Sequence, residues 1–237
     1  MLIWIVAAVF SYFIKGVCGF ANTLVFTILM SFFYSNVAIS PVELLLGLPS
    51  NLILVWKDRR LIRKAVCLPA ILLILIGSVA GTLFLKSTDT GLIKRIFGIV
   101  TLCFSAEMLL REIRPGRPAL PKAALAGIGV LSGLLCGLFN IGALMSVYIR
   151  QITPDTRSFK ANLCAVFLAE SAFRTVLYTA LGILTADILR RALLLAPFML
   201  LGLGLGMRCC GRLKERTVRL AVCCLLLLSG LLLIVTH

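Results

Sequence analysis

The chain has 237 residues, of which 61% are hydrophobic and 14% are charged. A soluble domain is roughly half apolar and a quarter charged, so this composition excludes an ordinary water-soluble protein. Lys and Arg outnumber Asp and Glu by 24 to 9, but the basic residues gather in short clusters between apolar runs. Such clusters indicate membrane topology and argue against a nucleic-acid-binding surface.

Eight apolar stretches follow one another, each long enough to cross or enter a hydrocarbon core about 30 Å thick. They are 2–33, 37–56, 65–85, 92–110, 123–149, 161–181, 192–210 and 220–235. The sequence therefore predicts an all-α, polytopic protein that makes multiple passes through the cell inner (plasma) membrane. The first fourteen residues carry no positive n-region and no small-residue cleavage site follows, so we expect no removable signal peptide.

Two homologous halves are predicted. The first transmembrane repeat is assigned to 1–112, a basic linker to 113–121 and the second transmembrane repeat to 122–237. The stretch 18–22 matches 136–140 with three identities at an offset of 118. Internal duplication of this kind is frequent in transporters.

The first segment of each half is unusually long, because 16–42 and 123–149 each run for 27 residues without a charge. Each could be a tilted spanning helix, or a broken hairpin that enters and leaves the membrane on one side. Lys and Arg of short loops accumulate on the cytoplasmic side. Spanning segments would place eleven loop charges on each side, whereas hairpins place 17 on one side and 5 on the other. The count favours six crossings and two hairpins, with the halves as inverted repeats.

Two basic residues, Lys15 and Arg174, lie inside apolar segments. A cation near the bilayer centre is costly, so it pairs with a carboxylate or meets a ligand. Glu170 precedes Arg174 by four residues, which suits an ion pair on one helix. The pair could serve only packing, or Arg174 could bind an oxyanion while Glu170 holds it or carries a coupling proton, with Ser171 nearby. Lys15 could snorkel to an interface or bind an anion.

The breaks in the two long segments supply further candidate substrate ligands, because a half-helix N-terminus offers free N–H groups to an anion. These candidates are Gly16, Gly19, Asn22 and Thr23 in the first half, and Gly137, Asn140 and Gly142 in the second. Ser50 and Asn51 lie at the centre of the second apolar segment and match Glu170 and Ser171 at an offset of 120. These polar centres predict one shared cavity.

Other polar features are expected to have structural roles. Glu43 and the pair Glu107 and Arg111 are interpreted as interfacial. The nine Cys lie largely within apolar runs and the single His is the last residue, which argues against disulfides and metal sites. We expect no metal and no cofactor.

The glycine-rich motifs 16–20 and 133–142 resemble those that open the two repeats of the TauE/SafE sulfite exporter family. The resemblance extends over essentially the whole chain. It includes Pro69 and Pro197, the pairs Gly77/Gly81 and Gly202/Gly206, and the closing stretch 229–232. It implies transport of sulfite, sulfonates or related sulfur-containing anions.

The leading hypothesis is a secondary carrier that moves a small anion by alternating access at a midplane site. The rivals are an anion channel and, further off, an assembly or structural subunit without transport activity. An enzyme is not expected, because HExxH, GxSxG and an internal His are all missing. The coupling ion, H+ or Na+, and the oligomeric state, with a homodimer as one option, stay open.

Overall fold

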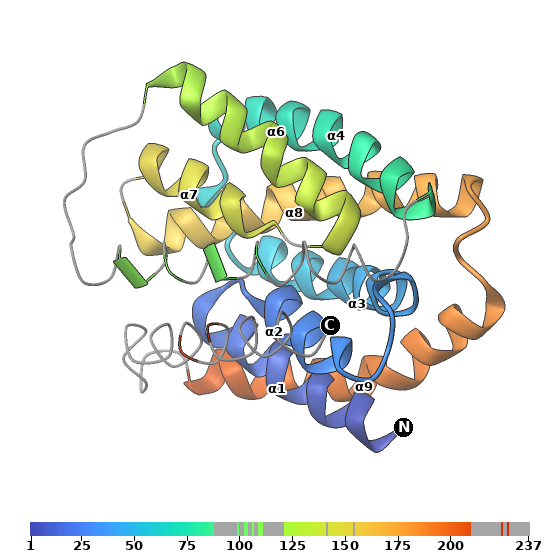
Figure 1. Ribbon diagram of the computed structural model, residues 1–237. Helices are drawn as coiled ribbons and strands as arrows, with labels where there is room; N and C mark the ends of the chain where they lie inside the picture. The colour runs from blue at the N-terminus through green and yellow to red at the C-terminus, as the bar shows by residue number, and fades with distance from the viewer. Residues whose placement is uncertain are drawn as a thin grey trace. The chain divides into compact units, whose positions relative to one another are not determined.

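In a computed structural model, the chain is described over residues 1–87, 121–140, 142–153 and 155–209, with isolated residues at 99, 102, 103, 106, 109, 110, 224 and 227. The described part is helical, which confirms the all-α prediction. Its elements are α1 (Leu2–Cys18), α2 (Asn22–Ser31), α3 (Asn36–Lys57), the 3-10 turn η1 (Arg59–Leu61), α4 (Lys64–Ser87), α6 (Lys122–Phe139), α7 (Ala143–Ile152), α8 (Thr156–Ala180) and α9 (Ala186–Cys209) (Figure 1).

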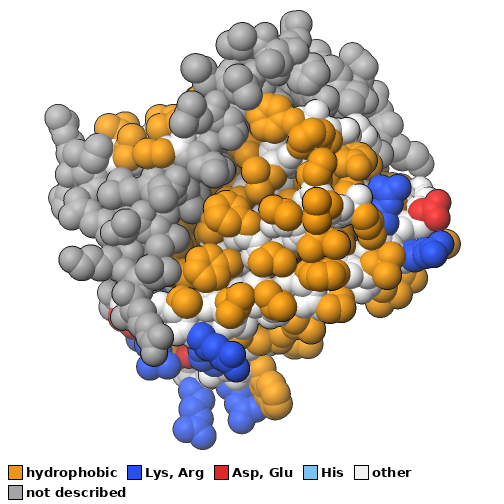
Figure 2. Space-filling model, turned by 90° about the horizontal axis from the view of Figure 1, so that it is seen from below, with side chains coloured by type: hydrophobic (Ala, Val, Ile, Leu, Met, Phe, Trp, Pro, Cys, Tyr) orange, Lys and Arg blue, Asp and Glu red, His pale blue; other side chains and the backbone are white. Residues whose placement is uncertain are grey.

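Four of these helices are long and apolar enough to cross a membrane. The candidate spans are Ala38–Lys57, Lys64–Leu83, Arg157–Ala180 and Ala186–Cys209. The other two predicted crossings, 92–110 and 220–235, lie outside the described residues, as does nearly all of the predicted linker 113–121. Large apolar side chains cover the described part of the face in Figure 2, as a lipid-facing surface requires.

The chain divides into two compact units that draw on both predicted halves. Unit 1 comprises Met1–Ile39, Thr88–Ala119 and Phe198–His237, and unit 2 comprises Ser40–Ser87 and Leu120–Pro197. Helices α3 and α9 pass from one unit into the other. The boundaries 1–112 and 122–237 of the repeats remain a prediction.

In unit 1, the first broken segment folds back on itself as a helical hairpin. The helix α1 ends at Gly19, whose φ of 84° lies in the left-handed region and whose N–H donates to the Lys15 carbonyl. Trp4, near the start of α1, packs on Phe26 at 5.9 Å and on Tyr34 at 5.0 Å between ring centroids. Because these partners belong to α2 and the turn beyond it, α2 runs antiparallel to α1.

In unit 2, the second broken segment makes the same fold. The helices α4 and α6 cross in parallel, since Gly77 faces Gly133 and Gly81 faces Gly137. The start of α8 contacts the chain just before α4, where Asn162 accepts a hydrogen bond from the Arg63 N–H. The helices α4, α6 and α8 therefore begin at the same end of unit 2, and α7 leads the chain back to it (Figure 1). The charge count predicts a hairpin in this segment, and its entry into the membrane from one side remains a prediction.

The two units contain matching glycine crossings. In unit 1, Gly206 of α9 faces the Phe13 carbonyl and Gly16 of α1. In unit 2, Gly81 of α4 faces the Leu134 carbonyl and Gly137 of α6 in the same way. A Cβ at any of these glycines would lie within about 3 Å of backbone atoms, so only glycine permits the close approach.

The matched contacts are separated by a constant number of residues. Gly16 and Phe13 lie 121 residues before Gly137 and Leu134. This spacing differs from the offset of 118 in the sequence alignment, and the duplication itself remains a prediction. Gly19, the C-cap of α1, corresponds to Asn140, the C-cap of α6.

Candidate functional site

A buried charge cluster lies in unit 2, centred on Arg174 of α8. The Arg174 side chain is 0% exposed and that of Glu170 is 2% exposed. Arg174 Nη1 donates to the Cys136 carbonyl and Nη2 donates to Asn140 Oδ1. Arg174 Nε lies 3.2 Å from Glu170 Oε1, an ion pair without the alignment of a hydrogen bond.

The Arg174 guanidinium lies at the C-terminal end of α6, where a positive charge is favourable. The last carbonyls of α6 have no partner further along the helix, and the C-terminal end of the helix dipole is negative. Arg174 gives the Cys136 carbonyl a second donor beside the Asn140 N–H, and the Tyr178 ring centroid lies 5.7 Å from the Arg174 Cζ. Tyr178 Oη in turn lies 3.2 Å from Ser40 Oγ. These contacts explain how the arginine is accommodated away from water.

Asn140 joins the arginine to a second carboxylate. Its backbone adopts the left-handed conformation with φ 60° and caps α6 through hydrogen bonds from its N–H to the Cys136 and Leu135 carbonyls. Its side-chain Nδ2 donates to Glu43 Oε2 of α3, while Oδ1 accepts from Arg174. One amide therefore bridges a carboxylate and a guanidinium at the tip of the hairpin.

Glu170 is held from another helix as well. Ser78 Oγ of α4 donates to Glu170 Oε1 at 3.0 Å, and both side chains are buried. Elements α3, α4, α6 and α8 thus each contribute a polar side chain or carbonyl to the cluster. Burying charge is tolerated only with such pairing and hydrogen bonding.

The segment after the break offers backbone donors. The helix α7 begins after Gly142 without a side-chain capping hydrogen bond. A Cβ at Gly142 would meet the ring of Phe167. The first turn of α7 is therefore the kind of helix N-terminus at which anions bind.

The predicted ligands of the first half lie in unit 1. Lys15 is buried, with Nζ 5.7 Å from the ring centroid of Tyr12. The backbone of α9 occupies the space that a Cβ at Gly16 would need, which gives Gly16 a packing role. Asn22 is the buried first residue of α2, and Thr23 follows it, half-buried.

The remaining predicted ligands lie in unit 2, and two of them belong to the Arg174 cluster. Asn140 and Glu170 contact Arg174 directly. Gly137, like Gly16, packs against the backbone of a crossing helix. Ser171 is buried on α8.

The polar pair of α3, Ser50 and Asn51, is buried in unit 2. Ser50 Oγ donates to the Gly47 carbonyl of its own helix at 2.7 Å. Asn51 is buried, and its Oδ1 has no hydrogen-bond partner among the described residues. Their role as ligands stays a prediction.

Sequence reasoning missed Glu43 and Ser78. The Glu43 side chain is 1% exposed and accepts a hydrogen bond from Asn140, so it belongs to the buried cluster, while its position relative to the membrane interface remains a prediction. Glu170 is therefore not the only buried carboxylate. A carboxylate five residues inside a candidate span was the available signal, since such a group needs a partner. The pair Glu107 and Arg111 lies outside the described residues.

A family model for the sulfite exporter TauE/SafE matches residues 4–233. The chain belongs to the TauE/SafE sulfite exporter family. No curated protein and no solved structure matches it. Membership of an exporter family agrees with the apolar helices, and together they identify a membrane protein of the transporter class.

Proposed function

We propose that this TauE/SafE protein is a secondary transporter of the cell inner membrane that moves a small anion by alternating access. Sulfite, a sulfonate or another sulfur-containing anion is the expected substrate. Family membership supports the class of solute. The observation that carries the proposal is the buried Arg174, whose guanidinium faces two neutral acceptors at the break between α6 and α7.

The substrate would take over the place of those acceptors. The Cys136 carbonyl and Asn140 Oδ1 carry only partial charge, whereas an oxyanion carries a full one. Hydrogen bonds between two charged groups are roughly twice as strong as neutral ones. An anion that reaches Arg174 therefore competes well with both, and backbone N–H groups at the start of α7 could add donors.

Displacement of Asn140 would couple binding to movement. Asn140 is both the cap of α6 and the bridge from Arg174 to Glu43, so it fixes the tip of the hairpin. When the anion replaces its side chain on Arg174, one of these restraints is lost. A ligand shifts a conformational equilibrium only through such a difference in contacts.

Glu170 remains our candidate for coupling transport to a proton. It contacts Arg174 and accepts from Ser78, so its protonation would weaken the hold on the guanidinium while the anion is bound. Na+ is the alternative coupling ion. A channel for the same anion would show conductance without gradient coupling, and an assembly subunit would bind no anion.

Ligand binding to the purified protein tests the proposal. Thermal unfolding is measured with sulfite, thiosulfate, a sulfonate and a carboxylate, because a ligand that binds only the folded state raises its stability. At 100 times the dissociation constant the gain is about 2.7 kcal/mol. We expect a shift with at least one sulfur-containing anion in the parent and none in Arg174→Met. A parent that responds to none of these anions would contradict the proposal.

A further inference from the structure

A cluster of basic side chains lies on the short connection between α3 and α4, here called the basic loop and defined as residues 57–64. Five of its eight residues are basic and exposed. They are Lys57, Arg59, Arg60, Arg63 and Lys64. The basic loop contains a single acidic residue, Asp58, whose Oδ1 lies 3.3 Å from Nη2 of Arg157 at the start of α8. The pair with Arg157 neutralises this carboxylate and leaves the positive charge of the loop uncompensated on its own element.

The basic loop is held in place by one buried side chain. Asn162 of α8 is 0% exposed. Its Oδ1 accepts from the Arg63 N–H at 2.8 Å, and its Nδ2 donates to the Leu61 carbonyl at 3.2 Å. Cys67 Sγ lies 3.2 Å from the same Oδ1. The backbone of the loop is therefore fixed, and its basic side chains are presented from a preformed turn instead of a flexible strand of chain.

Exposed apolar side chains of α3 and α4 lie directly beside the basic loop. On α3, Leu52 and Trp56 are exposed, Trp56 by 72%. On α4, Leu68, Leu72 and Ile76 are exposed in the turns after Lys64. Both helices are candidate spans, so we expect these faces to contact acyl chains. A Trp at the end of a span is typical of the headgroup level.

We infer that the basic loop is a binding site for anionic phospholipid headgroups. A phosphodiester and its acyl chains match the two kinds of surface that meet here, exposed cations at Lys57–Lys64 and exposed apolar side chains directly beside them. Clusters of basic residues next to a membrane span attract anionic lipid. The site is independent of the Arg174 cluster, so it goes beyond the proposed transport function.

The two Trp residues of the chain allow a direct test. Trp56 lies next to the site, whereas Trp4 is 2% exposed. The full-length Trp4→Phe protein is reconstituted in vesicles with varying fractions of brominated phosphatidylglycerol or brominated phosphatidylcholine. Bromine quenches only a nearby indole, so quenching reports which lipid occupies the surface beside Trp56. If Trp4→Phe does not fold, the parent chain is used with Trp56→Phe as its blank.

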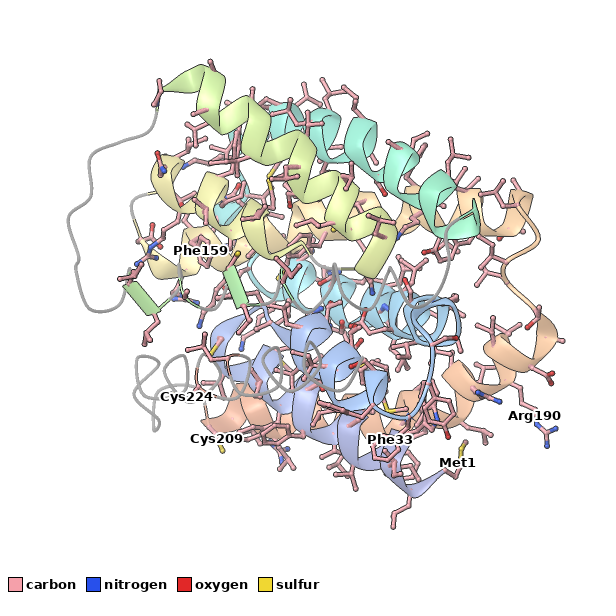
Figure 3. All side chains as sticks on the ribbon, viewed as in Figure 1. Met1, Phe33, Phe159, Arg190, Cys209 and Cys224 are labelled. Atoms are coloured by element: carbon pink, nitrogen blue, oxygen red, sulfur yellow. The ribbon has the colours of Figure 1, made fainter. Side chains whose placement is uncertain are left out.

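We expect phosphatidylglycerol to be preferred over phosphatidylcholine beside Trp56 by about fivefold or more, which is the contribution of a single basic side chain. Arg59→Gln/Arg60→Gln should lose most of this preference. The matched control is Arg190→Gln/Arg191→Gln, an exposed doublet at the start of α9, which should retain it. Figure 3 shows Arg190 far from Phe159 of α8. Phe159 lies three residues before Asn162, which holds the basic loop.

Equal quenching by the two lipids in the parent would overturn the inference. An equal loss in both doublets would also overturn it, because the preference would then follow net charge and not this loop. Inorganic phosphate added at millimolar concentration should leave the quenching unchanged. Its abolition by phosphate would assign the site to a soluble anion instead of a lipid.

Discussion

Replacing Arg174 alone should destabilise the protein far more than replacing it together with Glu170. In Arg174→Met, the Glu170 carboxylate is left buried without the cation that lies 3.2 Å away. Removing one member of a buried pair costs about 3–5 kcal/mol of unfolding free energy. In Arg174→Met/Glu170→Met both charges are gone, and apolar side chains of similar size fill the space.

The double variant is not expected to reach the stability of the parent. Asn140 Oδ1 still loses its donor, at about 1–3 kcal/mol for an unsatisfied buried group, while the Cys136 carbonyl keeps the hydrogen bond from the Asn140 N–H. We therefore expect it to recover about 2 kcal/mol relative to Arg174→Met.

The assay is the free energy of unfolding in SDS–detergent mixtures for the parent, both single variants and the double variant, which gives the coupling energy of the pair. Transport is measured on the same preparations. We expect the double variant to be folded and inactive, because its packing is kept while the anion site is lost. A double variant that transports at the parental rate would refute the role of Arg174. One no more stable than Arg174→Met would refute the ion-pair reasoning.

Three further predictions follow from the hairpins. Gly81→Ala places a methyl group against the backbone of α6 and should lower the free energy of unfolding in the SDS titration by about 1–3 kcal/mol. The control is Gly127→Ala, whose added methyl group meets nothing within 4 Å. It should be neutral or raise the free energy of unfolding by up to about 1 kcal/mol. Asn140→Gly keeps the left-handed cap and should be about 1 kcal/mol more stable than Asn140→Ala. Both should keep or increase the response to anions in thermal unfolding, because the acceptor that competes with the anion for Arg174 is gone. In a chain otherwise free of Cys, single cysteines at positions 60 and 157 should react with an impermeant maleimide from the same side of the membrane, since the two neighbourhoods are joined by the ion pair between Arg157 and Asp58. Labelling from opposite sides would restore the eight-span topology.

Much of the fold could be predicted, because it depends on features that leave a strong mark on the sequence. Apolar length predicts the spans, and four of them are helices long and apolar enough to cross a membrane. The side of the membrane on which each helix begins, taken from loop charge, remains a prediction. The hairpins could be predicted because Gly and Asn interrupt two long uncharged runs. The spacing of 121 residues between the matched glycine contacts could not be found by matching residue identities, since Asn22 begins a helix and Asn140 caps the end of one.

The residues of the site were harder to predict from the sequence than the fold. Glu170 and Arg174 share one helix, so their spacing predicts their contact. Glu43 and Ser78 reach the cluster from other helices, and only tertiary packing brings them there. Gly16 and Gly137 lie beside the breaks, which predicts a ligand role; the structure adds a packing role that the sequence does not show, because a crossing helix lies against the Cα of each.

Flux of labelled sulfite into proteoliposomes containing the purified protein tests the central claim most directly. The account predicts saturable uptake that depends on a proton or sodium gradient and falls to the level of protein-free vesicles in Arg174→Met/Glu170→Met. Uptake by the parent that never exceeds that of protein-free vesicles, or uptake by the double variant that equals the parent, would contradict it.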